Sequence, residues 1–155
     1  MREHWMQMAI DLAVENVDSG TGGPFGAVIV KGDELVASGV NMVTATRDPS
    51  AHAEVVAIRA ACRQLGDFQL TGCELYTSCE PCPMCLGAIY WARLERYFFA
   101  STRCHAAEVG FDDEFIYREM SLPPHARSIP GELLLPEAGS RAFTRWLASA
   151  SKISY

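Results

Sequence analysis

The sequence predicts an α/β protein in which helices pack in layers against a mixed β-sheet. Apolar residues recur at helical spacing over residues 2–17, whereas short, β-branched apolar runs at 25–30 and 35–40 indicate strands. A turn at 31–34 joins these strands into a hairpin, which makes the sheet mixed rather than purely parallel. Further strands then alternate with helices, and this order is typical of layered α/β proteins.

The remaining elements follow the same alternation. A polar loop over 41–49 precedes a helix over about 51–64, for which Ser50 is the expected N-cap. We expect a strand at 74–78, a helix from Pro83 to about Ala92, a strand at 97–100 and a fifth strand at 133–135. Helical patterns at about 108–119 and 138–150 close the chain. No repeat or long linker divides the 155 residues, so one domain (1–155) is predicted.

Composition restricts the partners and the compartment. The formal net charge is -6 and no segment is rich in Lys or Arg, so nucleic acid is not expected as the main partner. No apolar run approaches the ~18 residues of a membrane span, and the N-terminus lacks the apolar segment of a signal peptide. We therefore expect a cytoplasmic protein whose six cysteines are reduced and available to a metal.

One combination of residues predicts a catalytic zinc site. His52 is followed by Glu54, and Cys82 and Cys85 stand in a P-C-x-x-C segment. His52, Cys82 and Cys85 supply three ligands, and a catalytic zinc keeps its fourth position for a water or hydroxide. We therefore expect one Zn²⁺ per subunit. Glu54 is the carboxylate that moves protons beside it.

Helix N-termini make these side chains suitable for a metal. Pro83 is well tolerated in a first helical turn, which puts Cys82 at or near the N-cap and Cys85 in the first turn. The positive end of the helix dipole lowers the pKa of both thiols. His52 is expected in the first turn of the preceding helix. Because Glu54 lies only two residues further along, it points in a different direction and suits proton transfer rather than metal binding.

Other uses of the cysteines stay open at this point. Cys79, Cys82 and Cys85 form a C-x-x-C-x-x-C segment, but Ile89 stands where an iron–sulfur motif needs its next cysteine. A structural zinc site that includes Cys79 is a second alternative, and it leaves Glu54 without a role. A non-catalytic zinc or redox module is the corresponding functional hypothesis.

The whole set of motifs resembles the cytidine deaminase superfamily and, within it, the small bacterial guanine deaminases. The H-x-E and P-C-x-x-C pair is a signature of zinc-dependent nucleobase deaminases. The resemblance runs through residues 22–30, 48–54, 76–92 and 110–117, with G-F-D-D at 110–113 and the terminal Tyr155 as its more selective marks. It implies a three-layer α/β/α fold with a central five-stranded mixed sheet. It also implies hydrolysis of guanine to xanthine and ammonia in purine catabolism or salvage.

The resemblance assigns roles that the motif alone does not. The purine base is implied to lie against Phe25 and His52, with Asn41 and the Ala53 backbone N–H at its polar edges. Asp113 is implied to contact the base and to act as a second proton carrier. Judged from the residues alone, Phe25 is also typical of a core strand, Asn41 of a turn, and Asp113 of a solvated helix start.

Trp91, Tyr155 and a homodimer are also expected to contribute to the substrate pocket. Trp91 is expected to line the pocket from the motif helix. The resemblance implies a homodimer in which the C-terminal segment, about 131–155, is exchanged between subunits, so that Tyr155 closes the neighbour's pocket. The same zinc core also serves deaminases of cytosine or cytidine and of tRNA adenosine, so another base or nucleoside is the alternative substrate.

Overall fold

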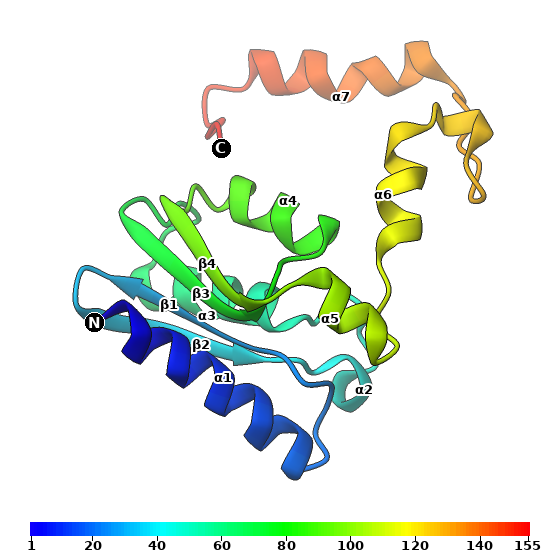
Figure 1. The fold of residues 1–155 in the computed structure, drawn as a ribbon. Coiled ribbons are helices and arrows are strands. Elements are labelled where there is room, and N and C mark those ends of the chain that lie inside the picture. Colours follow the sequence, from blue (N-terminus) through cyan, green and yellow to red (C-terminus); the bar gives the residue numbers. More distant parts are fainter. The chain divides into compact units, whose positions relative to one another are not determined.

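The computed structural model describes residues 1–155 and divides into two compact units, Met1–Asp113 and Glu114–Tyr155. Figure 1 follows the chain from blue to red. The first unit contains α1 (Arg2–Asp18), β1 (Gly26–Lys31), β2 (Glu34–Val40), α2 (Val43–Thr46), α3 (Ala53–Leu65), β3 (Cys73–Cys79), α4 (Pro83–Trp91), β4 (Arg96–Ser101) and α5 (Arg103–Glu108). The second contains α6 (Glu114–Ser121), a 3-10 turn (Pro124–Ala126) and α7 (Pro136–Ala148).

The first unit has three layers around a mixed sheet. Its strands lie in the order β2-β1-β3-β4, with β1 antiparallel to both neighbours and β3 parallel to β4 (Figure 1). The helix α1 packs on one face of the sheet, and α3 and α4 cover the other. The predicted hairpin and the mixed sheet are therefore confirmed.

Strand β1 explains how the two helical layers share one sheet. Side chains alternate across a strand, so Ala27 and Ile29 join the core beneath α3, whereas Val28 and Val30 join the core beneath α1. All four are buried. Because helices cover both faces, residues 27–30 of this strand form an uninterrupted apolar run and not an alternation of polar and apolar residues.

Two glycines allow the helices to lie close to the sheet. A Cβ atom on Gly39 of β2 would collide with the Ala53 carbonyl oxygen and the Ala57 backbone nitrogen of α3. A Cβ atom on Gly26 of β1 would collide in the same way with the backbone of α1 at Ala9. The absence of a side chain at Gly39 thus sets how closely the first turn of α3 approaches the sheet.

The predicted elements at 2–17, 25–30, 35–40, 74–78 and 97–100, and the helix from Pro83, agree with the structure to within about two residues. The polar loop at 41–49 contains the short helix α2, which was not predicted. The single helix expected at about 108–119 is wrong, because Gly110 takes a left-handed conformation with φ 97 between α5 and α6.

The fifth strand expected at 133–135 is also wrong, and the sheet has four strands. Leu135 is the N-cap of α7 and has a left-handed backbone with φ 52, which a strand does not allow. Three consecutive leucines are too few to show the periodicity that distinguishes a strand from a helix or coil. The strand was therefore predicted wrongly.

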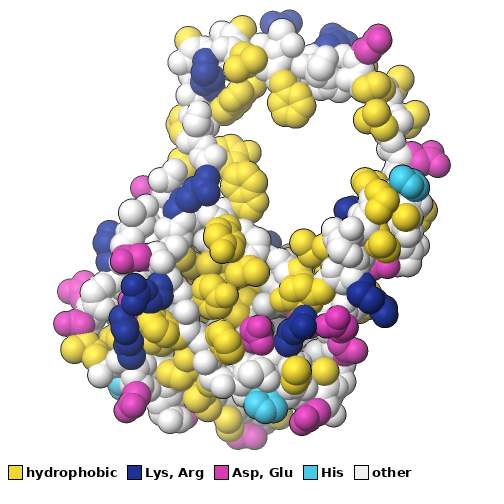
Figure 2. Space-filling model, turned by 45° about the horizontal axis from the view of Figure 1, so that its top comes forward, with side chains coloured by type: hydrophobic (Ala, Val, Ile, Leu, Met, Phe, Trp, Pro, Cys, Tyr) yellow, Lys and Arg dark blue, Asp and Glu magenta, His cyan; other side chains and the backbone are white.

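The second unit contains no buried residue of its own. Exposed fractions of 85% at Leu133, 83% at Leu134 and 73% at Phe143 show that its apolar side chains lack a core within the unit. Figure 2 shows hydrophobic side chains, in yellow, at the surface of this unit. Its internal bonds are local and polar, such as those from the Ser128 backbone and hydroxyl to Glu119 at 2.6 and 2.7 Å. The single domain over 1–155 stays a prediction. No helix has the length and hydropathy needed to cross a membrane.

Candidate active site

Two helix N-termini in the first unit carry the predicted metal ligands. His52 is the N-cap residue of α3, Cys82 is the N-cap residue of α4, and both have extended backbones. Cys85 follows in the first turn of α4, so the prediction for the two cysteines is confirmed. The expected Ser50 N-cap is wrong, because its backbone N–H and its hydroxyl both donate to Asp48 in a turn that closes before the helix begins.

The three donor atoms fit a zinc ion. The Nδ1 atom of His52 lies 3.6 Å from Sγ of Cys82 and 3.5 Å from Sγ of Cys85, and the three residues offer donor atoms within 4.8 Å of one another. With Zn–S near 2.3 Å and Zn–N near 2.0–2.1 Å, tetrahedral geometry separates sulfur and nitrogen ligands by about 3.6 Å. The observed separations match this value.

Cys79 does not belong to this group of donors. Its thiol donates to the carbonyl of Thr102 at 3.7 Å, and the converging ligands are those of His52, Cys82 and Cys85. Burial raises the pKa of the Cys79 thiol to about 11, so it stays protonated. Both alternatives that gave Cys79 a ligand role, the iron–sulfur motif and the structural Cys3His zinc, therefore lack their extra ligand.

Hydrogen bonds within the ligand set move its proton equilibria in opposite directions. The hydrogen bond from Cys85 lowers the pKa of Cys82 to about 4, while the same bond and burial raise the pKa of Cys85. The hydrogen bond with Cys82 also raises the pKa of His52. Since metal ligands bind in their deprotonated forms, zinc binding here must release protons, and zinc affinity is expected to rise with pH.

Glu54 is the buried carboxylate beside the donors. It is the second residue of α3, only 6% of it is exposed, and burial raises its pKa. The thiol of Cys85 is one of its hydrogen-bond partners. A carboxylate with a raised pKa next to a zinc site is suited to accept and return a proton near neutral pH.

Asn41 is a buried residue held in one orientation. Its Oδ1 atom accepts hydrogen bonds from the backbone N–H groups of Gly23 at 3.4 Å and Val43 at 3.3 Å. The side chain of Asn16 donates to the carbonyl oxygens of Gly23 and Asn41 at 2.8 and 2.9 Å. These bonds turn the amide oxygen of Asn41 toward the backbone and leave its N–H groups as donors. Asn16 was not predicted from the sequence, because a single polar residue in an amphipathic helix belongs to no recognisable motif.

Aromatic and acidic residues complete this region of the first unit. Phe25 packs against the core and meets Phe111 edge-to-face, with ring centroids 4.9 Å apart and an interplanar angle of 86°. Burial and then the negative charge of Cys82 raise the pKa of Asp113, which indicates that this carboxyl lies near the ligand set. Phe111 was not singled out from the sequence, although it belongs to the G-F-D-D segment.

The other predicted site residues differ in their surroundings. Ala53 is the first residue of α3, and the first helical bond runs from Val56 to His52, so the Ala53 N–H has no acceptor within the helix. Trp91 ends α4, six residues after Cys85 and about 9 Å further along the axis. Tyr155 is an exposed residue of the second unit. The substrate-binding roles of all three stay predictions.

A layered α/β unit with a histidine, two cysteines and a buried glutamate at two helix N-termini defines a zinc-dependent deaminase. Residues 1–101 match the family described as "Cytidine and deoxycytidylate deaminase zinc-binding region", and the chain belongs to this family. Zinc is accordingly its cofactor.

Individual relatives of the chain include a guanine deaminase and a tRNA-specific adenosine deaminase. The chain is 52% identical over 153 residues to the guanine deaminase of Bacillus subtilis, which covers 99% of this chain and 98% of that protein. The X-ray structure of the B. subtilis guanine deaminase superposes with a TM-score of 0.98 over 100% of this chain and 99% of that chain. A tRNA-specific adenosine deaminase of Aquifex aeolicus is 40% identical over 100 residues, which is 64% of this chain and 66% of that protein.

Proposed function

We propose that this protein is a guanine deaminase that hydrolyses guanine to xanthine and ammonia. The observation that carries the proposal is the 52% identity to the B. subtilis guanine deaminase over nearly the whole of both chains. This similarity extends beyond residues 1–101, which match the broader family of zinc deaminases. The region beyond them contains Asp113 and the terminal Tyr155, the residues for which we propose contacts that distinguish a purine base.

The zinc site and Glu54 support a direct route for the hydrolysis. Zinc held by His52, Cys82 and Cys85 supplies Lewis acidity that makes water a stronger acid. Glu54 takes a proton from the attacking water. The oxygen of this water then bonds to the ring carbon that carries the amino group. Glu54 returns this proton to the neighbouring ring nitrogen. It then moves the proton of the new hydroxyl group to the amine, which leaves as ammonia when the C–N bond breaks and the C=O bond forms. The burial of Glu54 supports both halves of this exchange.

The surrounding residues would orient the base. Phe25 offers an aromatic surface for the flat ring, and the fixed N–H groups of Asn41 suit the ring's acceptors. The N–H of Ala53 is a further donor at the start of α3. Asp113 accepts hydrogen bonds from ring N–H groups and is our candidate for a second proton carrier. Trp91 is retained as a candidate pocket residue.

A different base or nucleoside is the second candidate substrate. The similarity to the A. aeolicus tRNA-specific adenosine deaminase favours it, whereas the net charge of -6 does not favour binding of a polyanion. Chromatography of zinc-loaded protein incubated in parallel with guanine, guanosine, adenine, cytosine and cytidine tests both. We expect xanthine from guanine alone. Turnover of another compound without xanthine formation would refute the substrate proposal while leaving the zinc chemistry intact.

We also propose a homodimer in which the C-terminal segment, about 131–155, is exchanged. The absence of buried residues in the second unit supports this, because a unit without a core of its own must cover its apolar side chains elsewhere. The Pro-rich connector at 121–130 is suited to carry a segment away from its own subunit. In this assembly Tyr155 closes the partner's pocket.

Subunit complementation distinguishes exchange from a tail that folds back on its own subunit. One chain carries Glu54→Ala and the other lacks Tyr155, and the two are co-expressed with different tags and purified as a hybrid. Exchange gives the hybrid one complete site, so its activity exceeds that of either parent. A hybrid no more active than its more active parent would show that Tyr155 acts within its own subunit, and full activity in the parent that lacks Tyr155 would show that this residue has no role.

The cysteine ligands of the zinc site bear on the compartment in which the protein acts. Two thiolate ligands need reduced cysteines, and all six cysteines are free in the structure. We therefore propose the cytoplasm as the site of action, within purine catabolism or salvage.

A further inference from the structure

The loop between β2 and α3 joins two parts of the candidate site. It begins at Asn41 and ends at His52. The Met42 backbone N–H donates to the Ala51 carbonyl at 2.9 Å, which ties the two ends of the loop together. This bond forms only when the residues between Asn41 and His52 close the loop, so the relative position of the two residues depends on the loop conformation.

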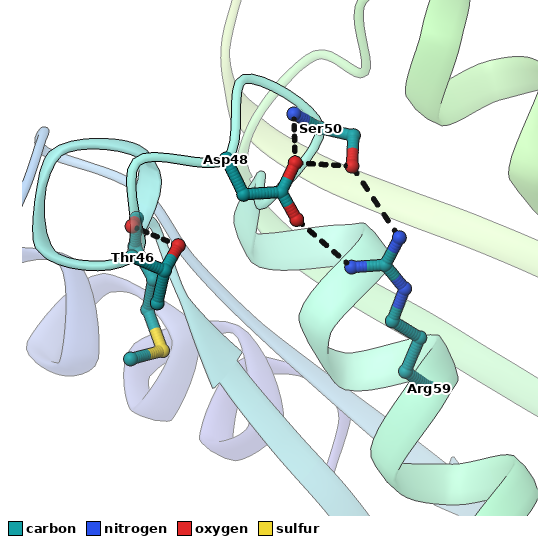
Figure 3. Close-up of polar contacts among 5 residues, drawn as sticks. Thr46, Asp48, Ser50 and Arg59 are labelled. Atoms are coloured by element: carbon teal, nitrogen blue, oxygen red, sulfur yellow. Dashed lines mark hydrogen bonds and ion pairs between the residues drawn. The ribbon is translucent and has the colours of Figure 1, made fainter.

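Three side chains hold this loop against α3. The Oδ1 atom of Asp48 accepts from the backbone N–H of Ser50 at 2.8 Å and from its hydroxyl at 2.6 Å. Arg59 lies 3.5 Å from the other carboxylate oxygen of Asp48 and donates to the Ser50 hydroxyl at 3.3 Å. Figure 3 shows the guanidinium of Arg59 reaching from α3 to both loop residues. Hydrogen bonds from Ser50 lower the pKa of Asp48, so the carboxylate is charged at neutral pH.

The helix geometry explains why Arg59 can reach the loop. Arg59 stands seven residues after His52, which is about two helical turns, so both lie on the same side of α3. Side chains on a helix lean toward its N-terminus, which directs Arg59 toward the loop. The residue before Asp48, Arg47, has a left-handed backbone with φ 54. That conformation is unfavourable for a residue with a side chain and needs its surroundings to maintain it.

We propose that Asp48, Ser50 and Arg59 form a positioning clamp that holds His52 and Asn41 in the arrangement that zinc and the base require. The zinc donors lie elsewhere, at His52, Cys82 and Cys85, so the clamp acts through the loop and through α3. The inference rests on the zinc site that is part of the proposed function. Its consequences are slower loss of zinc and a lower KM, with little effect on kcat.

Zinc release to a chelator tests the clamp without any substrate. We expect the Asp48→Ala and Arg59→Gln variants of the full chain to lose zinc about tenfold faster than wild type, at the lower end of the effects of residues that support metal ligands. Arg59→Lys keeps the charge but not the fork of donors, so its rate should lie between wild type and Arg59→Gln. The KM of both disruptive variants should rise more than kcat falls.

Arg2→Gln is the matched control. It removes an ion pair of the same length, 3.5 Å, between Arg2 and Glu74, which joins α1 to β3 instead of holding the loop. Both arginines are exposed, so neither loss should change global stability much. Arg2→Gln should keep the wild-type rate of zinc loss.

Amide hydrogen exchange in metal-free protein provides a second measurement. Faster exchange at the Met42 N–H in Asp48→Ala, but not in Arg2→Gln, is the expected result. Asp48→Asn keeps the acceptor for the Ser50 turn and replaces Asp48→Ala if the latter does not fold. Zinc loss and Met42 exchange that stay within about twofold of wild type in the clamp variants would overturn the proposal. Neither measurement uses guanine, so failure of the substrate proposal leaves this result interpretable.

Discussion

Glu54 illustrates how burial makes an ordinary carboxyl group suitable for catalysis. The sequence predicts its role from its position two residues after His52, and the structure adds that it is 6% exposed with a raised pKa. A carboxylate in water would be a weak acceptor of protons at neutral pH. In this site, desolvation raises the pKa of Glu54, which brings its proton affinity nearer to what the proposed reaction needs.

We therefore expect Glu54→Gln to slow turnover strongly while zinc remains bound. Glutamine keeps the size and some hydrogen bonds of the side chain but cannot transfer a proton. We expect kcat for xanthine formation to fall by about 10²–10⁴, with zinc content by atomic absorption equal to wild type. A fall of less than about tenfold would mean that another group carries the proton.

Tyr76 provides a residue-scale prediction on stability. It is 1% exposed, and burial, together with the hydrogen bond to Glu74 at 2.8 Å, raises its pKa to about 12. The folded state therefore retains this proton more tightly than the unfolded state, in which the pKa is near 10. The resulting stabilisation is complete below pH 10 and is lost as the pH rises through about 12.

We expect the stability of Tyr76→Phe to fall less than that of wild type as the pH rises through this alkaline range. The measurement is the melting temperature of both proteins at pH 8 and pH 11, with Tyr90→Phe, an exposed tyrosine on α4, as control. Tyr76→Phe should lose less of its melting temperature between the two pH values than the other two proteins. Equal losses in all three would exclude Tyr76 as the source.

At the scale of elements, the approach of α3 to β2 determines where His52 lies. Gly39 permits this approach, and His52 is the residue at which α3 begins. Gly39→Ala should therefore displace the start of α3 and lower the free energy of unfolding by about 1–3 kcal/mol. It should also speed the loss of zinc.

Gly26→Ala is the control for this prediction, because its Cβ would meet α1 on the opposite face of the sheet. Chemical denaturation should show a comparable loss of stability in both variants, and chelator competition should show faster zinc loss in Gly39→Ala alone. Equal zinc loss in the two variants would indicate that general destabilisation, and not the position of α3, controls the metal.

An element could be predicted from the sequence where a single residue or short motif marks its boundary. Pro83 indicated the start of α4, since its ring suits a first helical turn, and Cys82 was correctly placed as its N-cap. The start of α3 was misplaced because Ser50, a typical N-cap residue, bonds to Asp48 instead. The leucines at 133–135 were misassigned because a three-residue run has no resolvable period.

At the scale of the whole molecule, the second unit is the part that needs a partner surface. Phe143, Trp146 and Leu147 recur at helical spacing on α7, with exposed fractions of 73%, 43% and 71%. We expect Leu147→Gln to weaken the proposed homodimer, since burial of a leucine side chain contributes about 1.5–3 kcal/mol. Sedimentation equilibrium measures the dissociation constant.

The control for this prediction introduces the same residue on the other side of α7. Arg145 lies about 200° around the helix from Phe143, so Arg145→Gln should leave the dissociation constant near that of wild type. Equal association of both variants would remove α7 from the interface, and a monomeric wild type would remove the dimer.

Local residue patterns were enough to predict the chemistry that we propose for this protein. The spacing of His52, Glu54, Cys82 and Cys85 was enough to predict a zinc site with a proton carrier, because ligand types and helix N-termini are local properties of the chain. The distances between the groups became known from the fold alone: His52 Nδ1 lies 3.6 Å from Sγ of Cys82 and 3.5 Å from Sγ of Cys85, and Cys79 is bonded elsewhere. Those separations arise from two helices packing on one sheet, and no short segment of sequence encodes the distance between residues thirty positions apart.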